Sequence, residues 1–65
     1  MNTIAAHAII DAYALEDCVV ILAAYAPDLY AQLRKAAASG TTGEDRLALA
    51  RQLAKQAYDR EKHLN

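Results

Sequence analysis

Three residues near the start of the chain have side chains that could do chemistry: His7, Asp11 and Cys18. On a helical wheel they fall within about 40° of one another, which suggests acid–base catalysis or metal binding. Cys18, however, lies about 16 Å beyond His7 along a helix axis, so the three cannot share a proton or a metal ion within one chain. We interpret His7 and Asp11 as a hydrogen-bonded pair one turn apart, and Cys18 as a small core residue. A metal site formed across a dimer by His7, Asp11 and their symmetry mates stays open as an alternative.

The rest of the sequence contains no pattern typical of an enzyme. Gly40 and Gly43 match neither phosphate-binding glycine motif, and no Ser or Thr stands in a recognisable nucleophile setting. Glu16 and Asp17 are sequence neighbours that would point about 100° apart on a helix, so they do not form a facing acid–base pair. One cysteine allows no intrachain disulfide, and a four-ligand zinc site lacks ligands. We predict a protein that is not an enzyme and that uses no cofactor or metal.

The element that must position these residues is the apolar stretch AYALEDCVVILAAYA, residues 12–26. Glu16 and Asp17 interrupt it, and it is shorter than the roughly 20 apolar residues of a bilayer span, so we predict no membrane association. We expect one helix over residues 3–25 with Thr3 as its N-cap. The helix is apolar on two sides. One side contains Ile4, Ala8, Leu15, Val19 and Leu22, and the other contains Ile9, Ile10, Tyr13, Val20, Ala24 and, at its edge, Ile21.

Two further helices follow. Pro27 ends the first helix and suits the first turn of a second one, over residues 27–38, with Gly40 as its C′ residue. The third helix, residues 42–63, has two overlapping capping boxes: Thr41 with Glu44, which is the preferred type, and Thr42 with Asp45. We predict a single all-α domain over residues 1–65, a small helical bundle of two long antiparallel helices plus one short connecting helix.

The chain has enough apolar material to cover only one of the two apolar sides of its first helix. A 65-residue domain is near the lower size limit for folding alone, and exposed apolar faces of this size are rare in monomers. We therefore predict a homodimer completed through Ile9, Tyr13, Val20 and Ala24.

Charge is divided unevenly between the two halves of the chain. Residues 1–33 contain four acids and no Lys or Arg, whereas residues 34–65 contain seven bases and four acids. We interpret this division as two halves that face each other, within one chain or across a dimer; the alternative is a charged docking surface. The lone cysteine and the lack of a basic segment at the start of the sequence predict a cytoplasmic protein.

Two surfaces are candidates for function. Aromatic residues flank Pro27 at a helix corner, and aromatic side chains are frequent binding anchors, so we predict contact with a larger protein through Tyr25, Leu29, Tyr30 and Arg34. The function favoured by the sequence is thus a protein-interaction module of the accessory, adaptor or inhibitor type. The alternative is a small DNA-associated regulatory protein that uses a basic strip on the third helix, made of Arg51, Lys55 and Lys62.

Overall fold

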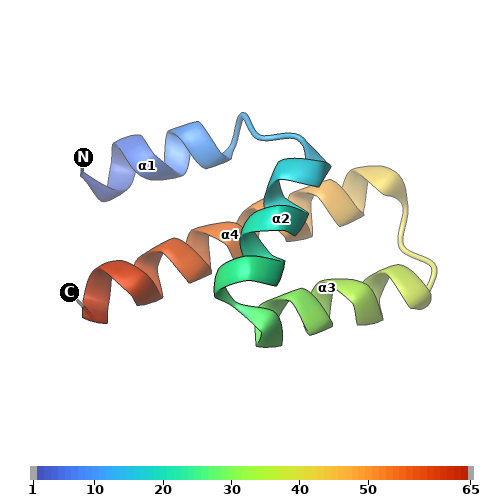
Figure 1. The fold of residues 1–65 in the computed structure, drawn as a ribbon. Coiled ribbons are helices and arrows are strands. Elements are labelled where there is room, and N and C mark those ends of the chain that lie inside the picture. The colour runs from blue at the N-terminus through green and yellow to red at the C-terminus, as the bar shows by residue number, and fades with distance from the viewer. Residues whose placement is uncertain (1, 65) are drawn as a thin grey trace.

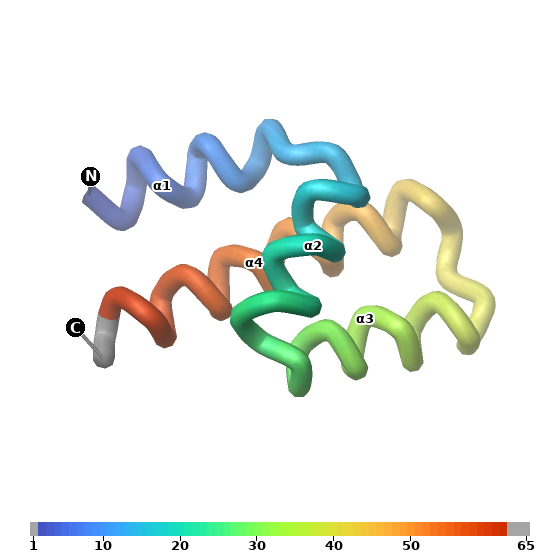
Figure 2. Tube along the Cα trace, in the orientation of Figure 1, coloured from blue at the N-terminus to red at the C-terminus, as the bar shows by residue number. Residues whose placement is uncertain are grey.

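The protein is all-α in the part of the chain that its computed structural model describes, residues 2–64, with side chains described for residues 2–62. Its four helices are α1 (Thr3–Ile10), α2 (Leu15–Tyr25), α3 (Pro27–Ala38) and α4 (Gly43–Leu64). Figure 1 shows α1 and α3 lying along α4 and running opposite to it, while α2 crosses α4. The tube in Figure 2 shows that α1 begins and α4 ends at the same end of the molecule.

The prediction of one continuous helix over residues 3–25 is wrong, because the chain leaves the helix after Ile10 and re-enters it at Leu15. A tight turn closes α1, in which the amides of Ala12 and Tyr13 donate to the carbonyls of Ile9 and Ile10, both at 3.0 Å. Arg51 of α4 donates from Nε to the carbonyl oxygen of Tyr13 at 3.0 Å. A distant side chain therefore satisfies a carbonyl that would accept from a backbone amide in a continuous helix.

The other helix ends follow local signals more closely. Asn2, and not Thr3, caps α1, because its side-chain oxygen accepts from the amide of Ala5 at 2.7 Å. Pro27 is the first residue of α3, as predicted, and Gly40 has the positive φ (88°) of a C′ residue. At α4 the hydroxyl of Thr42 accepts from the amide of Asp45 at 3.1 Å, so the second of the two capping options is used.

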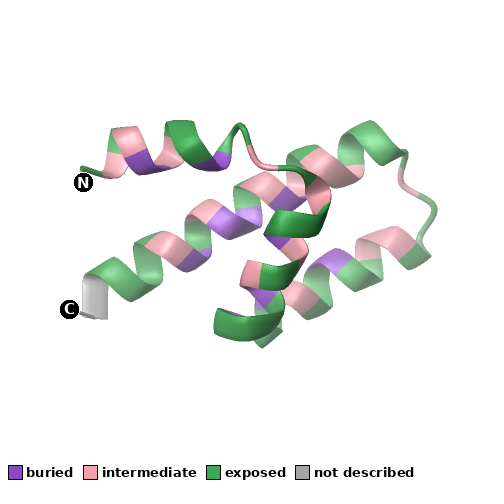
Figure 3. Cartoon of the chain, turned by 45° about the horizontal axis from the view of Figure 1, so that its top comes forward, coloured by how far each residue is buried: buried purple, intermediate pink, exposed green. Residues whose placement is uncertain are grey.

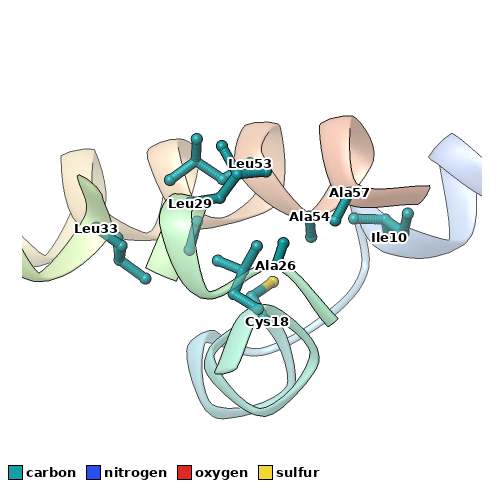
Figure 4. Close-up of a cluster of buried hydrophobic side chains, with 10 residues drawn as sticks. Ile10, Cys18, Ala26, Leu29, Leu33, Leu53, Ala54 and Ala57 are labelled. Carbon is teal, nitrogen blue, oxygen red and sulfur yellow. The ribbon is translucent and has the colours of Figure 1, made fainter. Parts of the chain in front are cut away.

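The core lies where α2, α3 and α4 meet. Cys18 and Leu22 of α2 are completely buried, and small α4 residues such as Ala50 and Ala54 let α2 approach α4 closely. Figure 4 shows side chains of this cluster converging from all four helices. Its buried members are Ile10, Cys18, Leu22, Ala26, Leu29, Leu33, Ala50, Leu53, Ala54 and Ala57.

The acidic and basic halves of the chain face each other within one molecule. Lys55 of α4 pairs with Asp11 just after α1, and Arg60 of α4 pairs with Asp28 of α3 at 2.8 Å. The sequence left open whether such pairs form within one chain or across a dimer, and these two form within one chain. Among the described helices, none combines the length and the hydropathy that a membrane span requires.

Candidate interaction surface

The three residues that suggested chemistry are separated by the fold. His7 Nε2 lies 2.9 Å from Asp59 Oδ1 of α4, and its ring meets the ring of Tyr58 edge-on at 6.2 Å. Asp11 pairs with Lys55. The predicted His7–Asp11 pair is therefore wrong, because both side chains have partners on α4. Among the described residues, no group of three or more His, Cys, Asp or Glu side chains could hold a metal ion.

Cys18 is in the core, as the sequence predicted. Burial raises the pKa of its thiol; the positive charge of Arg51 lowers this pKa and the negative charge of Asp17 raises it further. A buried thiol with a raised pKa is a poor nucleophile, since the thiolate is the reactive form. Cys18 thus acts as a small apolar side chain beside Leu22.

The three residues of the predicted basic strip all contact the N-terminal part of the chain. Arg51 donates to the carbonyl of Tyr13, Lys55 pairs with Asp11, and Lys62 Nζ donates to Thr3 Oγ1 at 2.8 Å. They attach α1 and the turn after it to α4. The strip therefore faces α1, and these cations already have partners within the molecule.

The exposed large apolar side chains among the described residues all belong to α1 and α2. The exposed fraction is 83% for Ile4, 43% for Ile9, 66% for Val20 and 69% for Tyr25. Figure 3 shows exposed residues along the outer sides of both helices. Ile4 was expected on the covered side of a longer helix, and this expectation is wrong because α1 ends at Ile10 and contacts α4 through Ala6 and Ile10 instead.

A groove of ≈ 390 Å³ lies between α1, α2 and α4. Its lining is apolar and aromatic except for one carboxylate, Glu61; the lining residues are Ala6, Ile9, Ile10, Tyr13, Ile21, Tyr25, Ala54, Ala57, Tyr58 and Glu61. Two smaller hollows adjoin it, because they share lining residues with it. One, of ≈ 380 Å³, is lined by Tyr13, Asp17, Val20 and Ile21. The other, of ≈ 280 Å³, is lined by Tyr25, Ala26, Ala57, Arg60 and Glu61.

The corner around Pro27, predicted as a partner-binding site, is divided by the fold. Leu29 is only 1% exposed and packs in the core, where a partner cannot reach it. Tyr30 is half-buried, and the guanidinium of Arg34 lies 5.8 Å from the centre of its ring, which is a cation–π arrangement. Tyr25, in contrast, is exposed at the wall of the groove.

The residues predicted as a dimer interface meet Tyr25 in the same region. Ile9 and Tyr13 line the groove, Val20 lines the adjoining hollow, and Ala24 is exposed on α2. The two surfaces that the sequence suggested separately thus form one apolar surface, which we call the α1–α2 face and define by Ile9, Tyr13, Val20, Ala24 and Tyr25. Glu61 was not predicted to belong to it, because only the packing of α4 beneath α1 brings this carboxylate to the groove.

Comparison of the chain with protein-family models, with curated proteins and with solved structures gave no match. The function is therefore argued from this surface alone.

Proposed function

We propose that this protein is a small non-enzymatic protein-interaction module that binds a larger protein through the α1–α2 face. The observation that carries the proposal is the concentration of exposed large apolar side chains at one apolar groove, which Ile9 and Tyr25 line, and at the hollow beside it, which Val20 lines. Single exposed apolar residues are ordinary on protein surfaces, but a contiguous apolar patch beside a groove is typical of a binding surface.

The chemistry of the groove also suits binding better than catalysis. Among the described residues, the ionisable side chains here apart from tyrosine hydroxyls are Glu61 in the groove and Asp17 and Arg60 in the adjoining hollows. An aromatic residue at the wall, such as Tyr25, is the kind of anchor that contributes most to many protein interfaces. The DNA-associated alternative receives no support from an observation, since Arg51, Lys55 and Lys62 contact α1 and its turn.

The predicted homodimer and a different partner compete for the same surface. A second copy bound through Ile9, Tyr13, Val20 and Ala24 would cover Tyr25 as well, because Ile9, Tyr13 and Tyr25 line the groove and Val20 lines the hollow beside it. The experiment that tests the proposal must therefore distinguish the two occupants.

Site-specific photocrosslinking makes this distinction. We would place p-benzoylphenylalanine at Tyr25, or at Gln32 on the exposed side of α3 as the control, and irradiate cells that naturally contain the protein. We expect a discrete adduct from position 25 and none from position 32. The adduct should disappear with Val20→Asp and persist with Ala31→Asp, which adds the same charge to an exposed position on α3.

The mass of the adduct identifies the occupant. An adduct much heavier than twice the 7.1 kDa chain supports binding to a larger protein. An adduct of twice the chain mass shows a homodimer instead. Equal yields from positions 25 and 32, or no adduct at position 25, would contradict the proposal.

A further inference from the structure

The charges around the groove specify the chemistry of its occupant. We propose that the α1–α2 face binds an amphipathic helix of a partner protein that has Lys or Arg at both ends of its apolar stripe. This inference rests on the proposed function and deepens it, because it names the kind of segment that the groove accepts.

The shape of the apolar surface suits a helix. The groove and its two adjoining hollows share Tyr13 and Ile21 on one side and Tyr25, Ala57 and Glu61 on the other, so they form one trough. A small molecule in the central groove would leave Val20 exposed, because this side chain stands in the adjoining hollow. A helix that lays side chains at i, i+3, i+4 and i+7 along the trough covers the groove and the hollows together.

A carboxylate stands at each end of this trough. Asp17 lines the hollow at one end, and Glu61 lines the groove and the hollow at the other. Within the described residues neither carboxylate has a salt-bridge partner. Arg60, the one cation that lines the trough, donates from Nη1 to both carboxylate oxygens of Asp28 at 3.1 and 2.8 Å. A carboxylate without a salt-bridge partner among the described residues therefore lies toward each end of the trough.

Glu61 is not explained by the stability of its own helix. It lies in the last turn of α4, where the helix dipole disfavours a carboxylate, and no Lys or Arg stands three or four residues away from it. Asp17, in contrast, is in the first turn of α2, where a carboxylate is favourable. A basic residue on the partner would give Glu61 the counter-charge that this chain does not supply.

A second copy of the chain satisfies these charges poorly. An interface about a twofold axis places the same face on both molecules, so acidic ends would meet acidic ends. The α1 and α2 helices contain no Lys or Arg that a symmetry mate could offer. The α4 cations Arg51, Lys55 and Lys62 contact their own α1 and its turn. Arg60, which lines the trough, is paired with Asp28 of its own α3. Charge complementarity therefore favours a different protein over a homodimer.

Two synthetic peptides test the inference. Each would be an amphipathic helix of about 15 residues with one leucine stripe; one would have lysines at both ends and the other glutamates. Binding of each labelled peptide to the full chain would be measured by fluorescence anisotropy at low salt. We expect the lysine-ended peptide to bind about five-fold more tightly, as two exposed charge pairs of ordinary strength predict.

Matched variants show whether the preference comes from the two carboxylates. Asp17→Asn with Glu61→Gln should remove the preference. Glu44→Gln with Asp45→Asn, which removes the same amount of charge at the start of α4, should retain it. Val20→Asp should abolish binding of both peptides, whereas Ala31→Asp should not.

Three results would overturn the inference, and they separate it from the proposed function. Equal binding of both peptides, abolished by Val20→Asp, would leave an apolar interaction surface without the basic ends. Binding of neither peptide, together with a heavy adduct at position 25, would show that the partner segment is not such a helix. Sedimentation of a dimer that Val20→Asp dissociates would make a second copy the occupant.

Discussion

The burial of α2 predicts a large difference in stability between two apolar truncations on the same helix. Leu22→Ala removes a side chain that is completely buried between α2 and α4, whereas Val20→Ala removes one that is 66% exposed on the α1–α2 face. The two residues are half a turn apart, so the comparison keeps the helix constant and changes only which side of it is truncated.

The expected costs follow from the exposed fractions. Truncation of a fully buried leucine to alanine lowers the free energy of unfolding by about 2–5 kcal/mol. Complete burial of a valine contributes about 1.5–3 kcal/mol, so the third of Val20 that is covered contributes about 0.5–1 kcal/mol. Alanine has a helix propensity better than that of valine by about 0.5 kcal/mol, which offsets most of this loss. We expect Val20→Ala to change stability by less than about 0.5 kcal/mol.

Urea denaturation followed by far-UV circular dichroism measures both values. A domain of 65 residues has a total stability of about 3–10 kcal/mol, so Leu22→Ala should lower the midpoint severely or leave the chain unfolded without denaturant. Equal losses for the two variants would refute the reasoning, because Val20 would then have to be covered in the protein in solution. In that case the cost of Val20→Ala should grow with protein concentration if a second copy supplies the cover.

Three further predictions follow from particular residues. Gly40→Ala should destabilise the protein by about 1–2 kcal/mol, because Gly40 has a φ of 88°. Gly43→Ala should stabilise the protein by about 0.4–1 kcal/mol, because Gly43 is in the first turn of α4 and an added Cβ would stand in open space. The melting temperatures of the two variants should therefore shift in opposite directions. The side-chain hydrogen bond from Arg60 lowers the pKa of Asp28. This pair therefore stabilises the fold fully above the ordinary Asp pKa, and its contribution is lost as the pH falls through the lowered pKa. In Arg60→Ala the NMR titration of the Asp28 carboxyl carbon should move to higher pH, and an unchanged titration would contradict the pairing. The Cys18 thiol should react with a thiol reagent only when the core opens. The rate of this reaction should therefore be far lower in native buffer than in urea. Equal reaction rates in both would show that the thiol is accessible in the folded protein.

Local sequence signals predicted most of the helix ends correctly, for reasons that are themselves local. Pro27 cannot continue a helix and suits the start of a new one, and Gly40 adopts a backbone conformation that other residues avoid. The core position of Cys18 also followed from its small apolar side chain. These features need no knowledge of distant parts of the chain.

The candidate site could be predicted only in part. The sequence predicted Ile9 and Val20 as residues that the chain does not cover and Tyr25 as a partner-contact residue, and the structure leaves all three exposed. It placed them on two separate surfaces, because residues 3–25 were read as one straight helix. It also placed Leu29 at the contact surface, although this side chain packs in the core.

By itself the sequence determined that the chain is helical and that helix boundaries fall at Pro27 and Gly40. It also determined that the chain has more apolar side chains than its own helices can cover. These properties depend on residue type and on spacing along the chain. Only the tertiary structure decided the break between α1 and α2. Nothing in residues 11–14 demands that break. It is stabilised by Arg51 and Lys55 of α4, which are 38 and 44 residues further along the chain than their partners Tyr13 and Asp11 and meet them only after the chain has folded. The same packing turned the predicted basic strip toward α1 and brought Glu61 to the groove, because the direction of a side chain depends on the neighbouring helix as well as on its own.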